Sequence, residues 1–150
     1  MDNDKINKVG FALAKITTEQ FAVFESNFNK AINPRLKLNF KFAADPVKKL
    51  VGVFAYFIFE CEEKPFIVIE AGCHFNIQPD SWNELLNDQH NSLTIPQKLM
   101  QHLAVITVGT TRGILHAKTE NTKFNRFHLP TINLAEIITE DKVFNLENNE

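Results

Sequence analysis

The chain has 150 residues, of which 44% are hydrophobic and 23% are charged, and its formal net charge is -2. A chain of this length buries about two-thirds of its unfolded surface in one domain, so these fractions exclude a disordered or fibrous protein. The near-neutral charge, without a basic stripe, predicts no nucleic-acid partner. The polar start at residues 1–5 and the lack of any apolar run of ~20 residues predict a cytoplasmic protein without a signal peptide or membrane insertion.

The first half of the chain predicts four strands. Residues 8–16 alternate small and large apolar side chains, and the apolar group at 21–24 either continues this strand past a bend or stands apart. The cleanest alternation sets Leu36, Leu38, Phe40 and Phe42 against polar neighbours, which indicates one buried and one wet face. Residues 50–61 are apolar on both faces and need cover on both sides. A turn at 62–65 and a strand at 66–71 complete a predicted four-stranded antiparallel meander.

The second half predicts helices. A short helix over 79–86 follows the sheet, and Pro96 opens a long amphipathic helix over 97–116, in which Gly109 and Gly113 are expected to allow close approach to the sheet. Asn133 and Glu136 have the spacing of a capping box for a short helix over 134–138. The termini, 1–7 and 139–150, are polar and expected to be flexible. The prediction is one α+β domain over 1–150, a four-stranded antiparallel sheet followed by a long helix and a short C-terminal helix.

Three patches of sequence resemble the SecB family of protein-export chaperones. The first is Pro34-x-Leu36-Lys37-Leu38, similar to the family's Pro-x-Val-Lys-Leu, and the second is Phe75-Asn76-Ile77, similar to Phe-Ser-Ile. The third patch is a succession of three motifs. Ile95-Pro96 is similar to the family's Phe-Pro, and Thr111-Arg112-Gly113-Ile114 is similar to Ser-Arg-Gly-Thr-Phe-Pro. Leu129-Pro130-Thr131-Ile132-Asn133-Leu134 is similar to Leu-Ala-Pro-Val-Asn-Phe. The resemblance runs from about Pro34 to Ile138.

The resemblance implies a holdase that binds unfolded or partly folded polypeptides in apolar grooves, without a cofactor, as a homotetramer built from two dimers. The groove is assigned to apolar residues of the second and fourth strands, namely Leu36, Leu38, Phe40, Phe42, Phe75 and Ile77. The oligomer interface is assigned to Ile67, Ile69 and Ala71 of the fourth strand, together with Arg112 as a residue that pairs across subunits.

Two features depart from the family. Residues 116–128 form a longer insert, with Lys123, Arg126 and two phenylalanines, at the mouth of the expected groove. Family members that dock on the SecA motor are strongly acidic and often end in a basic, metal-binding tail, which this chain lacks, so SecA docking is not expected. Two alternatives stay open: a dedicated chaperone of a toxin–antitoxin pair, and a protein that binds a small apolar ligand between sheet and helix.

Residues that carry catalytic or metal chemistry are scarce. Cys61 and Cys73 are expected to lie on the order of 20 Å apart on paired strands, too far for a disulfide. Adjacent strand residues such as Cys73 and His74 point to opposite faces, and the other histidines lack the paired spacing of a zinc site. The exposed pair Glu62-Glu63 has nothing to desolvate it. We therefore expect no catalytic residue, no metal and no cofactor, and a binding protein rather than an enzyme.

Overall fold

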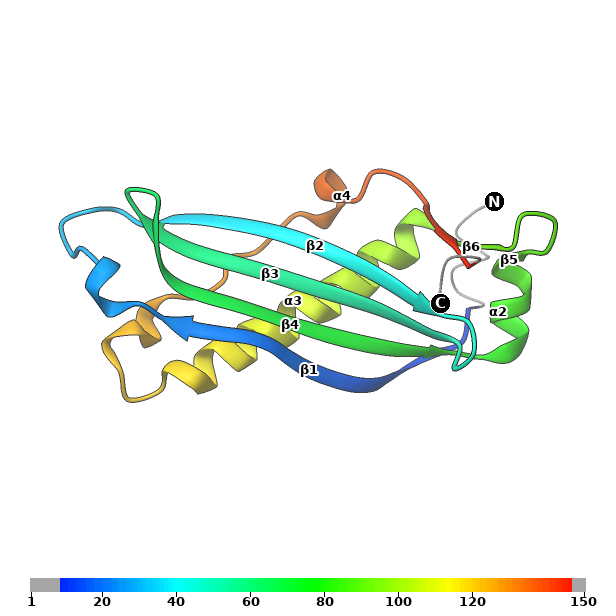
Figure 1. Cartoon of the computed structure of the whole chain (residues 1–150), viewed down its shortest axis with the longest axis horizontal. Coiled ribbons are helices and arrows are strands. Elements are labelled where there is room, and N and C mark those ends of the chain that lie inside the picture. Colours follow the sequence, from blue (N-terminus) through cyan, green and yellow to red (C-terminus); the bar gives the residue numbers. More distant parts are fainter. Residues whose placement is uncertain (1–8, 147–150) are drawn as a thin grey trace.

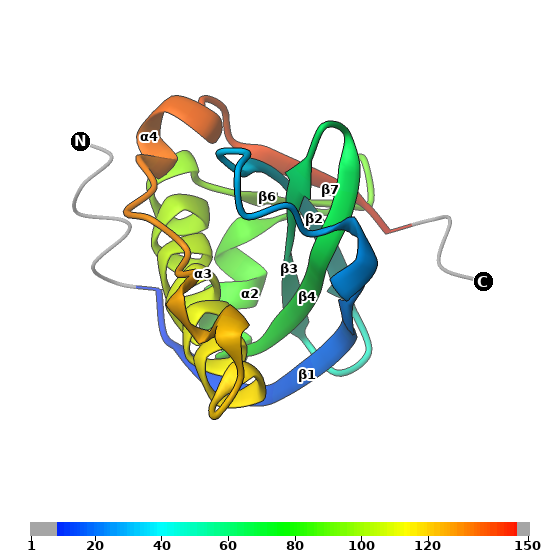
Figure 2. The same cartoon turned by 90° about the vertical axis from the view of Figure 1, so that its left-hand side faces the viewer.

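The computed structural model describes residues 9–146, and it confirms the predicted α+β class. Four long strands form one antiparallel sheet: β1 (Phe11–Val23), β2 (Arg35–Asp45), β3 (Leu50–Cys61) and β4 (Lys64–Ile77). The long helix α3 (Gln97–Thr119) crosses one face of this sheet diagonally, so that sheet and helix make two layers (Figures 1 and 2). We call the helix side the inner face and the opposite side the outer face.

The strand order is β1-β4-β3-β2, which corrects the predicted meander. β1 pairs with β4 because the segment 24–34, which includes the 3-10 turn η1 (Glu25–Asn27), carries the chain across the end of the sheet to the far edge. The predicted pieces of the first strand are one strand, and its register with β4 shifts twice, between Leu13 and Lys15 and between Thr18 and Gln20. Both β1 and β2 are edge strands of the sheet.

The core lies between α3 and the two central strands. The inner-facing side chains of β3 and β4 have no exposed surface at Val53, Ala55, Phe57, Ile69 and Phe75, because α3 packs directly on these strands. Cys61 and Cys73 are buried and free, as predicted. Their ladder partners are Lys64 and Val53 respectively, which places the two cysteines at distant points of the same hairpin.

Gly109 and Gly113 do not face the sheet, so the expectation that they allow close helix–sheet approach is wrong. Both are exposed, and a Cβ atom added at either position would meet nothing within 4 Å. The residues of α3 that contact the core are larger, such as Leu103, Val108 and Leu115. The two glycines therefore lie on the face of α3 that points away from the sheet.

A second, smaller sheet closes one end of the molecule and was not predicted. The short helix α2 (Pro79–Leu85) leads into β5 (Leu86–Asn87) and β6 (Ser92–Ile95), and β6 also pairs with β7 (Lys142–Asn145). Part of the tail expected to be flexible is thus a strand, because Phe144 pairs with Leu93 and is buried. Residues 1–7 and 147–150, expected to be flexible as well, lie outside the described residues.

Candidate binding groove

The inner face of β2 carries an apolar row that α3 does not cover. Its members Leu36, Leu38, Phe40 and Phe42 lie opposite Phe59, Phe57, Ala55 and Val53 of β3 in the ladder. The β3 partners are buried, whereas the β2 row is half-buried and Leu38 is 37% exposed. The reason is the position of α3, which packs on β3 and β4 and leaves the edge strand open. The row is the floor of the candidate groove.

The other wall of the groove is the segment between α3 and β7, which contains the short helix α4 (Leu134–Ile137). Asn133 caps α4, as predicted, by accepting a hydrogen bond from the backbone N–H of Ala135 at 3.2 Å. A cavity of about 220 Å³ opens between this wall and the floor, lined by Phe42, Met100 and residues 137–142. Ile137 is 41% exposed here. At this end the floor of the groove is therefore apolar, whereas the wall is mixed, with Ile137 beside Glu140, Asp141 and Lys142.

Side chains of α3 hold the wall in place. Arg112 donates from Nε to the carbonyl oxygen of Leu129 and from Nη2 to that of Pro130, both at 2.8 Å. Gln97 and Gln101 both donate to the carbonyl oxygen of Ile138, at 3.2 and 2.7 Å. The wall is fixed to the helix at two points, one near each end of the segment. Arg112 thus makes these two hydrogen bonds within the chain, and its role at a subunit interface stays a prediction.

The other end of the groove is closed by aromatic side chains. Phe127 lies 5.8 Å from Phe59 and 5.1 Å from Phe66, between ring centroids. Phe59 is the ladder partner of Leu36, so Phe127 borders the end of the floor at which β2 begins. The 3-10 turn η2 (Lys123–Arg126) precedes Phe127, and its Phe124 is buried in the same cluster. The predicted insert thus supplies the end of the groove.

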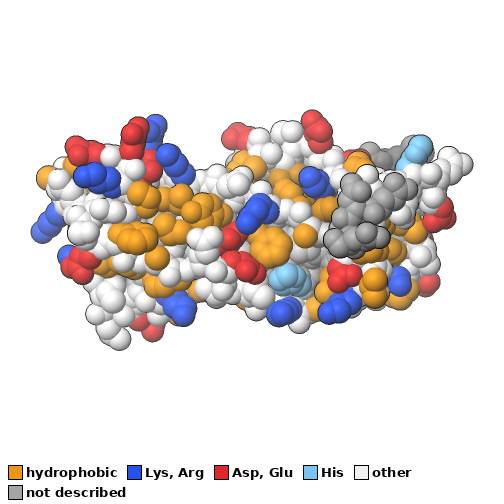
Figure 3. Space-filling model, viewed as in Figure 1, with side chains coloured by type: hydrophobic (Ala, Val, Ile, Leu, Met, Phe, Trp, Pro, Cys, Tyr) orange, Lys and Arg blue, Asp and Glu red, His pale blue; other side chains and the backbone are white. Residues whose placement is uncertain are grey.

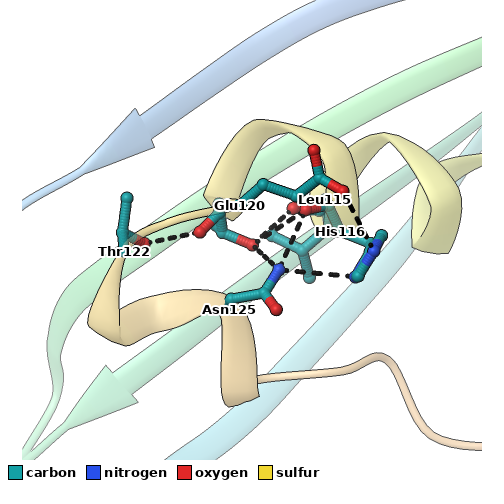
Figure 4. A network of polar contacts seen from close by, with 6 residues as sticks. Leu115, His116, Glu120, Thr122 and Asn125 are labelled. Atoms are coloured by element: carbon teal, nitrogen blue, oxygen red, sulfur yellow. Dashed lines mark hydrogen bonds and ion pairs between the residues drawn. The ribbon is translucent and has the colours of Figure 1, made fainter.

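Polar contacts fold the rest of the insert back onto the end of α3 (Figure 4). The side-chain amide of Asn125 donates to the carbonyl oxygen of His116 at 3.0 Å and to Thr119 Oγ1 at 3.2 Å. His116 Nε2 lies 3.5 Å from a carboxylate oxygen of Glu120, and Lys123 pairs with Glu25 of η1 at 2.7 Å. The insert is therefore an ordered turn, tied to both α3 and the segment after β1.

The outer face of the sheet has no element over it in the described part of the chain (Figures 2 and 3). Half-buried Phe54, Tyr56 and Ile58 of β3 point to this side, so the predicted double cover of β3 is found on the inner face only. Two carboxylates, on Glu60 and Glu70, are 3% and 4% exposed at the side chain.

The partners of these two carboxylates are lysines of β2. Lys37 Nζ lies 3.3 Å from Glu60 and Lys41 Nζ lies 3.0 Å from Glu70, and the lysine side chains are 58% and 62% exposed. The paired carboxylate oxygens have no well-directed hydrogen bond within the described structure. Lysine charge therefore compensates the burial of these two oxygens, and the other carboxylate oxygen of Glu70 accepts a hydrogen bond from Gln20 Nε2 at 3.5 Å.

β1, the other edge strand, also leaves apolar side chains open. Leu13 is 45% exposed, Ile16 49% and Val23 36%, all on β1, and Val105 on the outward face of α3 is 55% exposed. A cavity of about 460 Å³ lies where β1 meets the end of α3, lined by residues that include Phe21, Val23 and Lys118.

The remaining assigned residues lie inside the protomer. Phe75 and Ile77, assigned to the groove, have no exposed surface because α3 and β1 cover them. Ile67, Ile69 and Ala71, assigned to the oligomer interface, are also fully buried, since β4 is an inner strand whose inner face meets α3. Ile137 of the opposite wall was not predicted, although the cap signal at Asn133 and the SecB-like patch at Leu129–Leu134 lie just before it. Phe127 belongs to the insert that was expected at the mouth of the groove.

Among residues 9–146, no group of three or more His, Cys, Asp or Glu side chains is placed to hold a metal ion. None of the helices in that range is long and apolar enough to cross a membrane.

Neither a scan of protein-family models nor a search of curated protein sequences finds a match to this chain. Among solved structures, the chain is similar to a protein of unknown function from Streptococcus agalactiae, with a TM-score of 0.45, 14% identity, and coverage of 83% of this chain and 98% of the other. It is also similar to a SecB-like chaperone from Mycobacterium tuberculosis in complex with an antitoxin peptide, with a TM-score of 0.46, 11% identity, and coverage of 82% and 91%. At these identities neither similarity identifies a ligand or a partner for this chain.

Proposed function

We propose that this protein is a holdase, a chaperone that binds non-native polypeptide segments rather than catalysing a reaction. The observation that carries the proposal is the open apolar row on the inner face of β2, which faces a wall that α3 fixes in place and on which Ile137 is exposed. A monomeric protein seldom leaves a contiguous apolar groove open unless something binds there. The SecB-like motifs at Pro34–Leu38 and Leu129–Leu134 lie on the two sides of this groove and support the same function.

The groove suits weak, reversible binding. Its floor is apolar, so affinity comes mainly from burial of the client's apolar side chains, each worth roughly 1.5–3 kcal/mol when fully buried. Part of that free energy is lost in ordering the client, so several side chains must bind together. Such a groove favours unfolded segments with repeated apolar residues over any compact surface.

The proposed working form is a cytoplasmic homotetramer built from two dimers. The exposed apolar side chains of β1 and Val105 of α3 support assembly, although through different residues from those assigned in the sequence analysis. Contact with another protomer would bury Leu13 and Ile16, two large apolar side chains that β1 leaves about half exposed.

The test is light scattering coupled to size-exclusion chromatography, with and without a reduced, unfolded test protein. We expect a particle of about four times the 17.2 kDa of one chain, and retention of the unfolded protein on that particle. The same test protein in its native, oxidised form is the control and should elute separately. The proposal is contradicted if the unfolded test protein aggregates at the same rate with this protein as it does in buffer alone.

A dedicated chaperone of a toxin–antitoxin pair is the second candidate. The observation that favours it is the ordered insert, in which Phe127 closes the groove beside Leu36 and so gives it one defined end. A defined end narrows the set of segments that fit. Comparable affinity for several unrelated unfolded proteins supports the general holdase, whereas strong preference for a single protein encoded beside this chain supports the dedicated one.

A further inference from the structure

We propose that the groove takes its client as an added β-strand on the open edge of β2, and that it prefers segments in which apolar residues alternate with acidic ones. This inference rests on the proposed holdase function and specifies how the same groove binds. Strand addition uses the backbone hydrogen bonds of an edge strand for affinity and alternate side chains for specificity.

The edge of β2 is regular enough to accept another strand. β2 has β3 as its ladder partner on one side and ends the sheet on the other. Its register with β3 runs from Arg35–Glu60 to Asp45–Leu50 without a shift, whereas the β1–β4 and β3–β4 ladders both contain shifts. A bulge commonly protects an edge strand from pairing with another chain, and this ladder has none.

One end of this edge is occupied. Lys142, at the start of β7, lies over the rings of Phe42 and Phe144, so the tail of the chain lies beside the end of β2. The stretch from Arg35 to Lys41 precedes this contact. An added strand would therefore run along Arg35–Lys41, beside the groove floor.

The two faces of β2 set the pattern of the partner. Inner-facing positions are apolar, and outer-facing positions between them are Arg35, Lys37, Asn39 and Lys41, all exposed. Neighbouring strands present alternate residues to the same two faces. An added strand thus places every second side chain in the groove and the others beside these cations, where acidic side chains fit best.

The same charges disfavour a second copy of this chain. If two β2 strands paired across a two-fold axis, their outer-facing cations would lie against each other, and like charges on paired strands are destabilising. Glu60 and Glu70 offset Lys37 and Lys41 within the protomer, but Arg35 has no ion pair among the described residues. A client strand with acidic alternate residues supplies a negative charge for Arg35, whereas the β2 strand of a second copy of this chain does not.

The test uses labelled synthetic peptides and fluorescence anisotropy with the full chain. The first peptide alternates Val or Ile with Glu, the second replaces Glu by Lys, and the third has the composition of the first but groups its apolar and acidic residues into blocks. We expect the first to bind about fivefold more tightly than the second, because a glutamate pairs with the uncompensated charge of Arg35 whereas a lysine repels it. The third should also bind more weakly than the first, because its blocks cannot place every second side chain in the groove. Arg35→Glu should reduce the preference for the first peptide over the second.

Backbone methylation separates strand addition from side-chain binding. In an added strand, one set of alternate amides faces β2 and the other faces away. N-methylation of one set of the first peptide should abolish binding, and methylation of the other set should leave it within about twofold.

Three outcomes overturn the inference. Equal loss from both methylated sets, with an unfolded test protein still captured, contradicts strand addition but leaves the holdase function standing. Failure of every peptide and of the unfolded protein to bind removes both. Peptide affinity that falls as the protein concentration rises, together with a dimer that excess peptide dissociates, assigns the edge to a second copy.

Discussion

Leu38 of β2 lies directly opposite Phe57 of β3 on the same face of the sheet, yet Leu38 is 37% exposed and Phe57 is fully buried. The boundary between core and groove therefore falls between two paired residues. It is set by the path of α3, which covers the central strands and not the edge.

Replacing Leu38 by Ser should weaken capture of an unfolded protein while changing the free energy of unfolding by less than about 1 kcal/mol, because the side chain is partly exposed. Val47→Ser is the matched control, since Val47 is 87% exposed in the turn after β2 and should affect neither property. Aggregation suppression and urea denaturation measure the two effects. A loss of stability near the ~3–5 kcal/mol expected for Phe57→Ala would place Leu38 in the core instead.

Arg112→Lys should loosen the groove wall. A lysine keeps the charge but lacks the planar fork that reaches Leu129 and Pro130 together, so we expect a loss of about 1–3 kcal/mol in the free energy of unfolding. Hydrogen exchange should quicken over residues 129–138 in particular. Lys118→Met removes an exposed cation from the same helix and should leave that exchange unchanged. Exchange that quickens evenly over the whole chain would contradict a local role for Arg112.

Gly113→Ala should raise the free energy of unfolding of the isolated protomer by up to about 1 kcal/mol, because the new Cβ meets nothing and alanine favours a helix. Urea denaturation at low protein concentration measures this change. A loss of stability that grows with concentration would show that this face of α3 meets another protomer closely.

Lys41→Met should destabilise the protein by about 1–3 kcal/mol, since it leaves the buried carboxylate of Glu70 without its cation. Adding Glu70→Gln in the same chain should recover part of the loss by removing the unpaired charge. Lys15→Met, at an exposed position of β1, is the control. If the double variant is less stable than Lys41→Met alone, loss of the ion pair does not explain the destabilisation by Lys41→Met.

Ile16→Asp should reduce the mass of the particle measured by light scattering, because it places a charge among the exposed apolar residues of β1. Val143→Asp changes a residue of similar exposure on β7 and should leave the mass unchanged. Equal effects from both substitutions would argue against assembly through β1.

The alternation of residues 36–42 and the apolar run of 50–61 predict β2 and β3 correctly, because side-chain period follows directly from strand geometry. The order of the strands could not be predicted from such patterns, because β4, the partner of β1, lies more than forty residues further along the chain. No local sequence pattern shows that these two strands pair. β7 was missed for a related reason. Its four residues include one buried side chain, Phe144, which gains cover only from β6.

The groove, too, could be predicted from the sequence only in part. Period two placed the β2 row on one face, but it could not show which apolar positions of that face α3 covers, so Phe75 and Ile77 were wrongly grouped with Leu38. The interface assignment failed because β4 is an inner strand. Recognising the wall at Ile137 required the hydrogen bonds from α3 to the segment after it, which join residues far apart in sequence.

The pairing of β1 with β4 has a consequence for synthesis of the chain. Phe11 pairs with Ile77 and Val23 with Ile67, so the first strand made has no partner until residues 64–77 have left the ribosome. β2 and β3, by contrast, form a hairpin as soon as both are present. During that interval the nascent protein exposes an unpaired apolar strand of its own, and it presents the open edge of β2 before its first strand is in place.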